Sequence, residues 1–242
     1  MDSRRKQSFF SLTAGQRLGE NYRVVEWLGR GWEGEVYKVL ERGTGVERAA
    51  KIFYPRRNIH GTAIRRYARK LNRLRHVPAI IQYHHRARAR LGVMDVQFMV
   101  SEYVEGTMLD AFLAGQSGHR FPLFESLHLL RALAWSVAPI HQAREYHGDL
   151  HAENIIVRRA GTGFAVKLMD FFDIGQSNHD KIADDVFDLV NLFYKLIGGA
   201  ARYGACGSEI KQLVCGRRRA AVHRAFRNAS DLLAALDNLR WE

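Results

Sequence analysis

Cysteine is scarce in this sequence, with only Cys206 and Cys215 among 242 residues. Two thiols cannot build a disulfide framework, so we expect a reducing compartment and a cytoplasmic protein, with a metal site or a redox pair as the alternative. Long apolar runs are also missing, since no stretch reaches the roughly 18 residues that a membrane-spanning helix needs. The segment from Met1 to Phe10 lacks the apolar core of a signal peptide.

Acidic residues are absent from residues 48–94, within a chain whose net charge is +12. Lys and Arg are dense there, above all between Arg65 and Arg75. Such a block could attract an acidic protein partner, an anionic surface or nucleic acid. A solvated basic face is the simpler interpretation, because no recognised nucleic-acid module is present.

Hydrophobic periodicity predicts a strand-rich first half and a helical second half. The predicted strands lie at residues 22–28, 35–40, 48–54, 80–85 and 96–103. The predicted helices lie at residues 64–74, 125–143, 186–197 and 231–239. The chain is therefore expected to be an α+β protein, with a small antiparallel sheet and one helix followed by a mainly helical part.

A glycine motif, formed by Gly29, Gly31 and Gly34, lies between the first two predicted strands and is followed by Val36. A dinucleotide-binding fingerprint would require a helix after the glycines, whereas a strand follows here. A glycine loop between two strands can bring backbone N–H groups close to nucleotide phosphates. An ordinary glycine-rich turn is the alternative if no other motif accompanies it.

Three further motifs follow in order. Lys51, on the next predicted strand after Ala49 and Ala50, can reach phosphate oxygens as a point charge. The strongest signal is the run from His147 to Asn154, in which an aspartate can accept a hydroxyl proton and an asparagine five positions later can hold a metal ion. Asp170 ends an apolar strand, where a carboxylate can ligate Mg²⁺.

Taken together, these motifs resemble the eukaryotic-type protein kinase superfamily in a compact, bacterial-looking form. The resemblance covers residues 21–239, nearly the whole chain, and includes a hinge-like run from Phe98 to Val104. It implies a bilobal fold with an N-terminal extension at residues 1–19, an N-lobe at 20–104 and a C-lobe at 105–242.

The resemblance also implies a role for each matching residue. Asp149 would be the catalytic base, supported by Lys51, Asn154 and His151. Asn154 and Asp170 would hold Mg²⁺. The ATP-binding residues would be Gly29, Gly31, Gly34, Val36, Ala49, Lys51, Glu102, Val104 and Ile156. Asp185 would anchor the backbone of the catalytic loop.

Several departures from the family pattern affect the predicted function. The helix glutamate that normally pairs with the lysine is missing, and Tyr67 stands at its position. The catalytic loop reads His147-Gly-Asp-Leu-His151, and Phe172 replaces the glycine of the metal-binding motif. Only 14 residues separate Asp170 from Asp185, so the activation segment is short.

We therefore predict an ATP-dependent phosphotransferase that needs Mg²⁺, most simply a serine/threonine-protein kinase acting on a hydroxyl acceptor. The catalytic-loop sequence and the short segment also fit a small-molecule kinase for a sugar, lipid or antibiotic. The missing helix glutamate fits a nucleotide-binding pseudokinase scaffold, although Lys51, Asp149, Asn154 and Asp170 are all intact. The basic helix is the expected place for an acidic partner or anionic surface.

Overall fold

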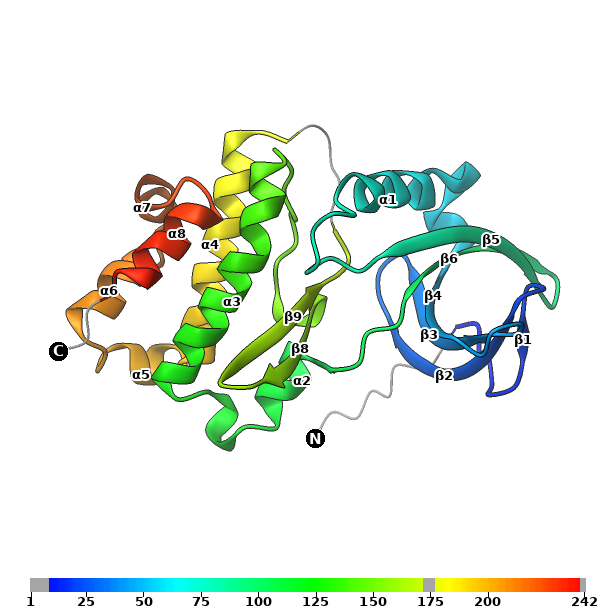
Figure 1. Cartoon of the computed structure of the whole chain (residues 1–242), viewed down its shortest axis with the longest axis horizontal. Coiled ribbons are helices and arrows are strands. Elements are labelled where there is room, and N and C mark those ends of the chain that lie inside the picture. Colours follow the sequence, from blue (N-terminus) through cyan, green and yellow to red (C-terminus); the bar gives the residue numbers. More distant parts are fainter. Residues whose placement is uncertain (1–8, 172–176, 240–242) are drawn as a thin grey trace. The chain divides into compact units, whose positions relative to one another are not determined.

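The structure is a computed structural model that describes residues 9–171 and 177–239. The chain divides into two compact units (Figure 1). The first unit contains the chain up to Arg75 together with residues 81–104, and the second contains residues 76–80 and the chain from Glu105 onward. No described helix combines the length and the apolar character needed to cross a bilayer.

A six-stranded antiparallel sheet, with the strand order β1-β2-β3-β4-β6-β5, dominates the first unit. Its strands are β1 (Arg17–Leu18), β2 (Tyr22–Arg30), β3 (Gly34–Glu41), β4 (Glu47–Phe53), β5 (Tyr83–Leu91) and β6 (Met94–Glu102). Between β4 and β5 lie the 3-10 turns η1 (Pro55–Arg57) and η2 (Ile59–Gly61), followed by the helix α1 (Thr62–Arg73).

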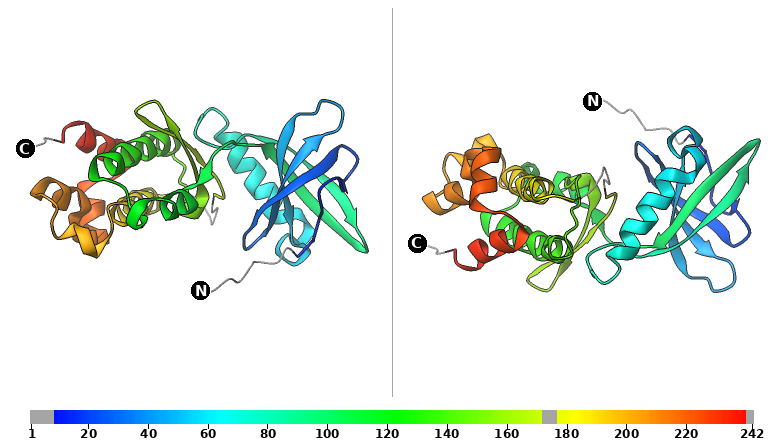
Figure 2. Two further views of the ribbon diagram at one scale, coloured as in Figure 1. Left: turned by 90° about the horizontal axis from the view of Figure 1, so that it is seen from below. Right: turned by 90° about the horizontal axis from the view of Figure 1, so that it is seen from above.

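Opposite faces of this sheet have different neighbours. One face carries a hydrophobic cluster that includes Tyr37, Ile52 and Phe98, and Phe10 from the N-terminal segment packs into it. The helix α1 contacts β5 and β6 and buries Ile64, Tyr67 and Leu71 (Figure 2). Since the apolar stripe of α1 faces the unit, its arginines at positions 65, 66, 69 and 73 are exposed.

The strand expected at residues 80–85 lies further along the chain, because β5 spans Tyr83–Leu91. Its side chains alternate between an exposed and an inward face, with Arg86 and Arg88 exposed and Ala89 and Leu91 buried. A strand with one solvated face needs apolar residues only at every second position. The basic run therefore belongs to the sheet and not to a loop.

The second unit is mainly helical and includes a small sheet with the order β7-β8-β9 (Figure 1). The strands are β7 (Thr107–Met108), β8 (Ile155–Ala160) and β9 (Gly163–Leu168). The helices are α2 (Leu109–Ala114), α3 (Leu123–Gln142), α4 (His179–Leu196), α5 (Ala200–Tyr203), α6 (Ser208–Val214), α7 (Arg219–Ala225) and α8 (Ala229–Asp237). Three 3-10 turns are η3 (Ser117–His119), η4 (Ala152–Asn154) and η5 (Cys215–Arg217).

The helices α3 and α4 form the centre of this unit. Leu133 and Val137 on α3 and Leu189 and Phe193 on α4 are almost completely buried. The helix α8 also packs on α3, and its N-cap is Asn228, whose side chain accepts hydrogen bonds from the N–H groups of the next turn. The helix begins two residues before the predicted range of 231–239, because the Asn228 side-chain oxygen reaches those N–H groups.

Candidate functional site

The catalytic loop lies between α3 and β8 in the second unit, and its polar residues contact one another. The Asn154 side-chain amide donates to the backbone carbonyl of Asp149 at 2.9 Å and to its carboxylate Oδ2 at 3.0 Å. Asn154 is buried, whereas the Asp149 side chain is 48% exposed. The short turn η4 brings residues five apart into contact, so the loop presents a fixed carboxylate that solvent can reach.

His151 is the third member of this cluster. Its Nδ1 lies 3.2 Å from the Glu153 backbone N–H, which donates to it. The other ring nitrogen, Nε2, lies 3.4 Å from Asp149 Oδ2 and 3.0 Å from the Asn154 amide nitrogen. His151 therefore lies within the catalytic-loop cluster, next to the proposed base.

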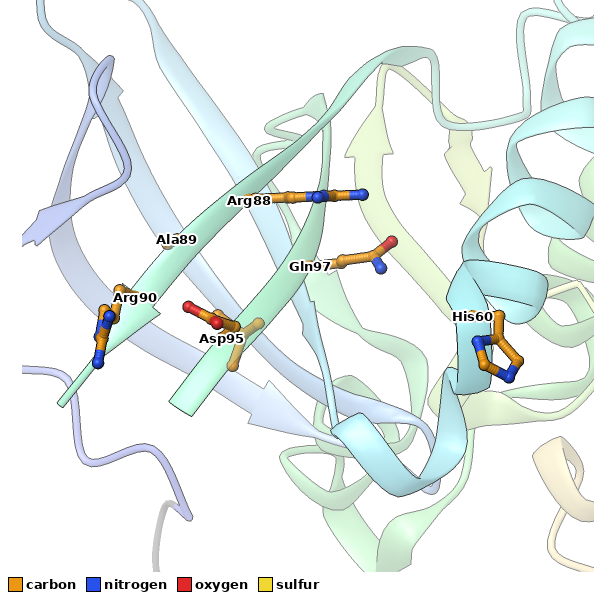
Figure 3. A pocket seen from close by; sticks show the side chains of 7 residues that line it. His60, Arg88, Ala89, Arg90, Asp95 and Gln97 are labelled. Carbon is orange, nitrogen blue, oxygen red and sulfur yellow. The ribbon is translucent and has the colours of Figure 1, made fainter. Parts of the chain in front are cut away.

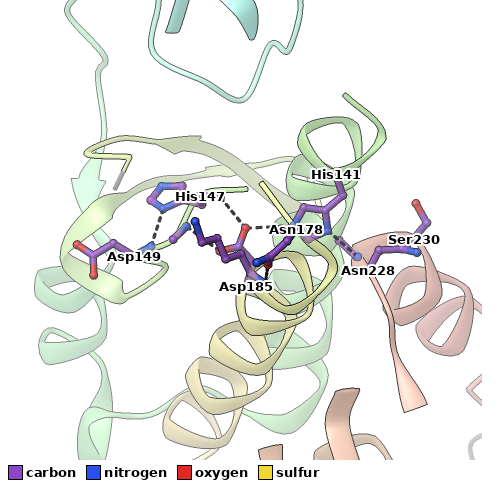
Figure 4. Close-up of polar contacts among 10 residues, drawn as sticks. His141, His147, Asp149, Asn178, Asp185, Asn228 and Ser230 are labelled. Atoms are coloured by element: carbon purple, nitrogen blue, oxygen red, sulfur yellow. Dashed lines mark hydrogen bonds and ion pairs between the residues drawn. The ribbon is translucent and has the colours of Figure 1, made fainter. Parts of the chain in front are cut away.

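Asp185 on α4 holds the backbone of the same loop in place (Figure 4). Its carboxylate accepts hydrogen bonds from the N–H groups of His147 at 2.6 Å and Gly148 at 2.8 Å. A third bond, of 3.1 Å, joins it to His141 Nε2 on α3. The predicted anchoring of the loop by Asp185 is thus confirmed, and the buried carboxylate has donors on both of its oxygens.

Asp170 lies just after β9. The residue before it, Met169, is hydrogen-bonded to the catalytic loop. The N–H of Met169 donates to the Asn154 carbonyl at 3.0 Å. Asp170 itself has a φ of 54°, a left-handed conformation that costs energy for a residue with a side chain and occurs often at functional sites. The ring of Phe171 lies 4.2 Å from that of His147. Phe172, the predicted departure in this motif, lies outside the described residues.

Asp188 on α4 has a raised pKa. Burial, followed by the negative charges of Asp185, Asp184 and Asp149, raises its pKa to about 7. Between pH 4 and 7 the native Asp188 carboxyl keeps a proton that the same carboxyl releases in the unfolded chain. The free energy of unfolding therefore falls as pH rises through this window.

We expect Asp188→Asn to stabilise the protein at pH 8 by about 1–2 kcal/mol, a value reduced for partial solvent screening. At pH 4.5 the gain should be much smaller, because the native Asp188 carboxyl is protonated there and only the ionisation of the unfolded chain contributes. Urea unfolding at the two pH values measures the difference, with Asp110→Asn as an exposed control. Equal effects at both pH values would contradict the assignment.

The glycine loop of the first unit connects β2 to β3. A side chain at Gly34 would place its Cβ 2.0 Å from the carbonyl oxygen of Ile52, so no other residue fits there. Gly29 and Gly31 have open space around the positions of their missing side chains. The loop is closed by a hydrogen bond of 2.9 Å from the Gly31 N–H to the Gly34 carbonyl. Only Gly34 is therefore required by packing, and the other two leave the loop backbone accessible.

Lys51 lies on β4 and its side chain is largely buried. Its ammonium is 3.3 Å from the carboxylate of Glu33 in the glycine loop. The ring of Tyr67 on α1 lies 5.2 Å from the same nitrogen, within cation–π range. The position of the missing helix glutamate is thus filled by an aromatic ring, and a loop carboxylate contacts the lysine. Sequence reasoning missed Glu33, whose only signal was its place within the glycine motif.

The other predicted nucleotide-binding residues are distributed over both units. Val36 pairs with Lys51 across β3 and β4, and Ala49 pairs with Ser101 across β4 and β6. The Glu102 N–H donates to the Gln82 carbonyl at 2.9 Å. Val104 ends the first unit's segment, and Ile156 belongs to β8 of the second unit.

Residues 22–187 match the protein kinase domain family. Among curated proteins, the chain is 30% identical over 155 residues to the dual specificity testis-specific protein kinase 1 of Homo sapiens, covering 63% of this chain and 23% of that protein. It is 31% identical over 160 residues to the serine/threonine-protein kinase pkn2 of Myxococcus xanthus, covering 64% and 18%. The chain thus spans less than a quarter of the length of these two relatives.

Solved structures show the same fold. The kinase domain of PknI from Mycobacterium tuberculosis superposes with a TM-score of 0.65 at 18% identity, over 95% of this chain and 100% of that domain. Rad53 in complex with AMP-PNP superposes with a TM-score of 0.67 at 20% identity, over 91% and 61%. The antiparallel sheet with its helix and the helical second unit therefore form the protein kinase fold, and the chain belongs to the protein kinase family of ATP-using phosphotransferases.

Proposed function

We propose that this chain transfers the γ-phosphate of ATP to a serine or threonine hydroxyl of a protein. The observation that carries the proposal is the catalytic-loop cluster, in which the exposed Asp149 carboxylate is oriented by the Asn154 amide. A carboxylate held in this way can accept the proton of an attacking hydroxyl. Because Asn154 is tied at both the backbone and the side chain of Asp149, the base is preorganised.

Asn154 and Asp170 are the residues that would hold Mg²⁺. The Asn154 nitrogen is directed at Asp149, which leaves its amide oxygen as the group for a cation. No group of three His, Cys, Asp or Glu side chains suited to a metal occurs within residues 9–171 and 177–239. Mg²⁺ in phosphoryl-transfer sites uses one or two side chains together with phosphate oxygens and water, so two protein ligands suffice. Bound there, the ion would neutralise charge on the phosphates.

Glu33 is proposed to compete with ATP for Lys51. Its carboxylate contacts the ammonium that would otherwise meet phosphate oxygens, and it would add a like charge beside them. This proposal follows from the absence of acidic residues on α1, which leaves the lysine to a carboxylate from the loop.

We expect Glu33→Gln to lower the dissociation constant for ATP about fivefold, since a partly exposed ion pair is worth about 1 kcal/mol. Calorimetric titration with ATP and Mg²⁺ measures the change. Glu26→Gln, an exposed carboxylate of β2, removes the same charge from the unit and serves as the control. Weaker binding in Glu33→Gln would mean that Glu33 positions Lys51 instead of competing for it.

A small-molecule kinase is the second candidate, favoured by the short activation segment. The helix α4 already begins at His179, so few residues remain after Asp170 to build a platform for a peptide.

The basic face of α1 is proposed as the contact for an acidic protein partner or an anionic surface, because Arg65, Arg66 and Arg69 are exposed along it. We also propose that the protein acts in the cytoplasm.

The proposed function is tested by ATP turnover with Mg²⁺, using either serine- and threonine-containing peptides or a panel of sugars, lipids and aminoglycosides as acceptors. Labelled phosphate on peptides is the expected result. Transfer to small molecules alone would favour the second candidate. Nucleotide binding without any transfer would overturn both and favour a scaffold.

A further inference from the structure

A basic pocket lies in the first unit, between the β5–β6 hairpin and the segment that leads into α1. It is an open, shallow pocket of about 700 Å³, and its polar lining consists of His60, Arg88, Arg90, Asp95 and Gln97. Figure 3 shows Arg88 and Gln97 extending from the hairpin toward the helical segment that carries His60. Arg90 and Asp95 lie further along the hairpin in the same view.

The alternation of β5 places arginines at this pocket. Arg88 pairs with Gln97 and Arg90 with Asp95 across the two strands, so these four side chains occupy neighbouring positions on the hairpin. Both arginines are exposed, whereas Ala89 between them points into the core. The sheet therefore fixes the backbone beneath two guanidinium groups at successive positions of one face.

The opposite wall depends on an unusual turn before α1. His60 has a φ of 52° and Gly61 a φ of 70°, two successive left-handed residues. A Cβ on Gly61 would come within 2.7 Å of the Gln97 side-chain oxygen, so the absence of a side chain lets Gln97 approach the turn. Arg65 closes the turn by donating to the His60 carbonyl at 2.6 Å, which holds the backbone of this wall in place.

The arginines of the pocket have no carboxylate partner within the described ranges. Neither Arg88 nor Arg90 forms an ion pair with another residue in the ranges 9–171 and 177–239. Asp95 is the one acidic residue of the lining. Excess positive charge in a concave site with a fixed backbone attracts an oxyanion, and guanidinium groups bind phosphate with two parallel hydrogen bonds.

We propose that this pocket binds a phosphorylated serine or threonine on a protein segment. An open pocket of about 700 Å³ has room for one phosphorylated residue with its neighbours. A nucleic-acid strand would place successive phosphates along the hairpin, where Asp95 would repel them, whereas a peptide can donate a backbone N–H to that carboxylate. The proposal concerns binding alone and does not depend on phosphoryl transfer by this chain.

The test uses a fluorescently labelled pentapeptide with a central phosphoserine flanked by glycines, titrated with the intact chain and followed by anisotropy. Arg88→Gln should weaken binding at least about tenfold, the loss of one bidentate charged contact. Arg86→Gln is the matched control, because Arg86 is exposed on the same face of β5 but does not line the pocket. It should change binding less than about twofold.

Further titrations distinguish a phosphopeptide from other anionic ligands. Unphosphorylated peptide should not bind, and inorganic phosphate should compete only weakly because it lacks the peptide contacts. Equal losses in Arg86→Gln and Arg88→Gln would overturn the proposal in favour of a diffuse basic face. A single-stranded oligonucleotide that binds more tightly than the phosphopeptide, with the same dependence on Arg88, would overturn it in favour of nucleic acid.

Discussion

Asp170→Ala is expected to abolish phosphoryl transfer, with a fall in turnover of at least about a thousandfold. Loss of a metal ligand removes several kcal/mol of charge stabilisation from the transferring phosphate, and each 1.4 kcal/mol is about tenfold in rate. The left-handed backbone at Asp170 directs this carboxylate from the end of β9, next to the hydrogen bond between Met169 and Asn154. Turnover with ATP and Mg²⁺ measures the effect.

Asp149→Ala provides the comparison that separates metal binding from proton transfer. It should also lose turnover, because the acceptor hydroxyl then has no base. The two variants should differ in a nucleotide titration. Asp149→Ala should keep the gain in ATP affinity that Mg²⁺ confers, and Asp170→Ala should lose it. Parental turnover in Asp170→Ala, or an unchanged effect of Mg²⁺ on its affinity, would contradict the metal assignment.

Local residue order was enough to predict the catalytic loop. Asp149 and Asn154 are five residues apart, and a single 3-10 turn brings their side chains together within the loop that Asp185 anchors. The anchoring role of Asp185 was implied by the resemblance to protein kinases, and the structure places this charged residue on the buried side of α4. Such a charge must find hydrogen-bond donors when it is buried.

Other features depend on tertiary contacts that local sequence patterns do not encode. Glu33 looked like a loop residue, and its contact with Lys51 arises only when β3 and β4 pair. The extent of β5 was misjudged because its arginines hide the alternation that buries Ala89 and Leu91. His141 lies on a helix that was predicted from its apolar residues alone, yet it links two other segments through both ring nitrogens.

The contacts of His141 explain how the second unit is held together around Asp185. The Ala229 N–H at the start of α8 donates to His141 Nδ1 at 3.0 Å, so the ring proton lies on Nε2 and faces Asp185. The carboxylate of Asp185 thus joins α3, α4, α8 and the catalytic loop within one buried network (Figure 4). A network of this kind is stabilising only while every member is satisfied.

Asp185→Ala is therefore expected to lower the free energy of unfolding by about 3–5 kcal/mol, because it leaves three donors, two of them buried, without an acceptor. Urea unfolding measures this loss. Asp184→Ala is the matched control, because the carboxylate of Asp184 pairs with Arg219 at the surface. Removing that carboxylate should lower the free energy of unfolding by no more than about 1 kcal/mol. Asp185→Asn should fall between the two, since the amide keeps one accepting oxygen but turns a donor toward another donor. A loss in Asp185→Ala no larger than that of the control would mean that water replaces the carboxylate and that the loop does not depend on this anchor.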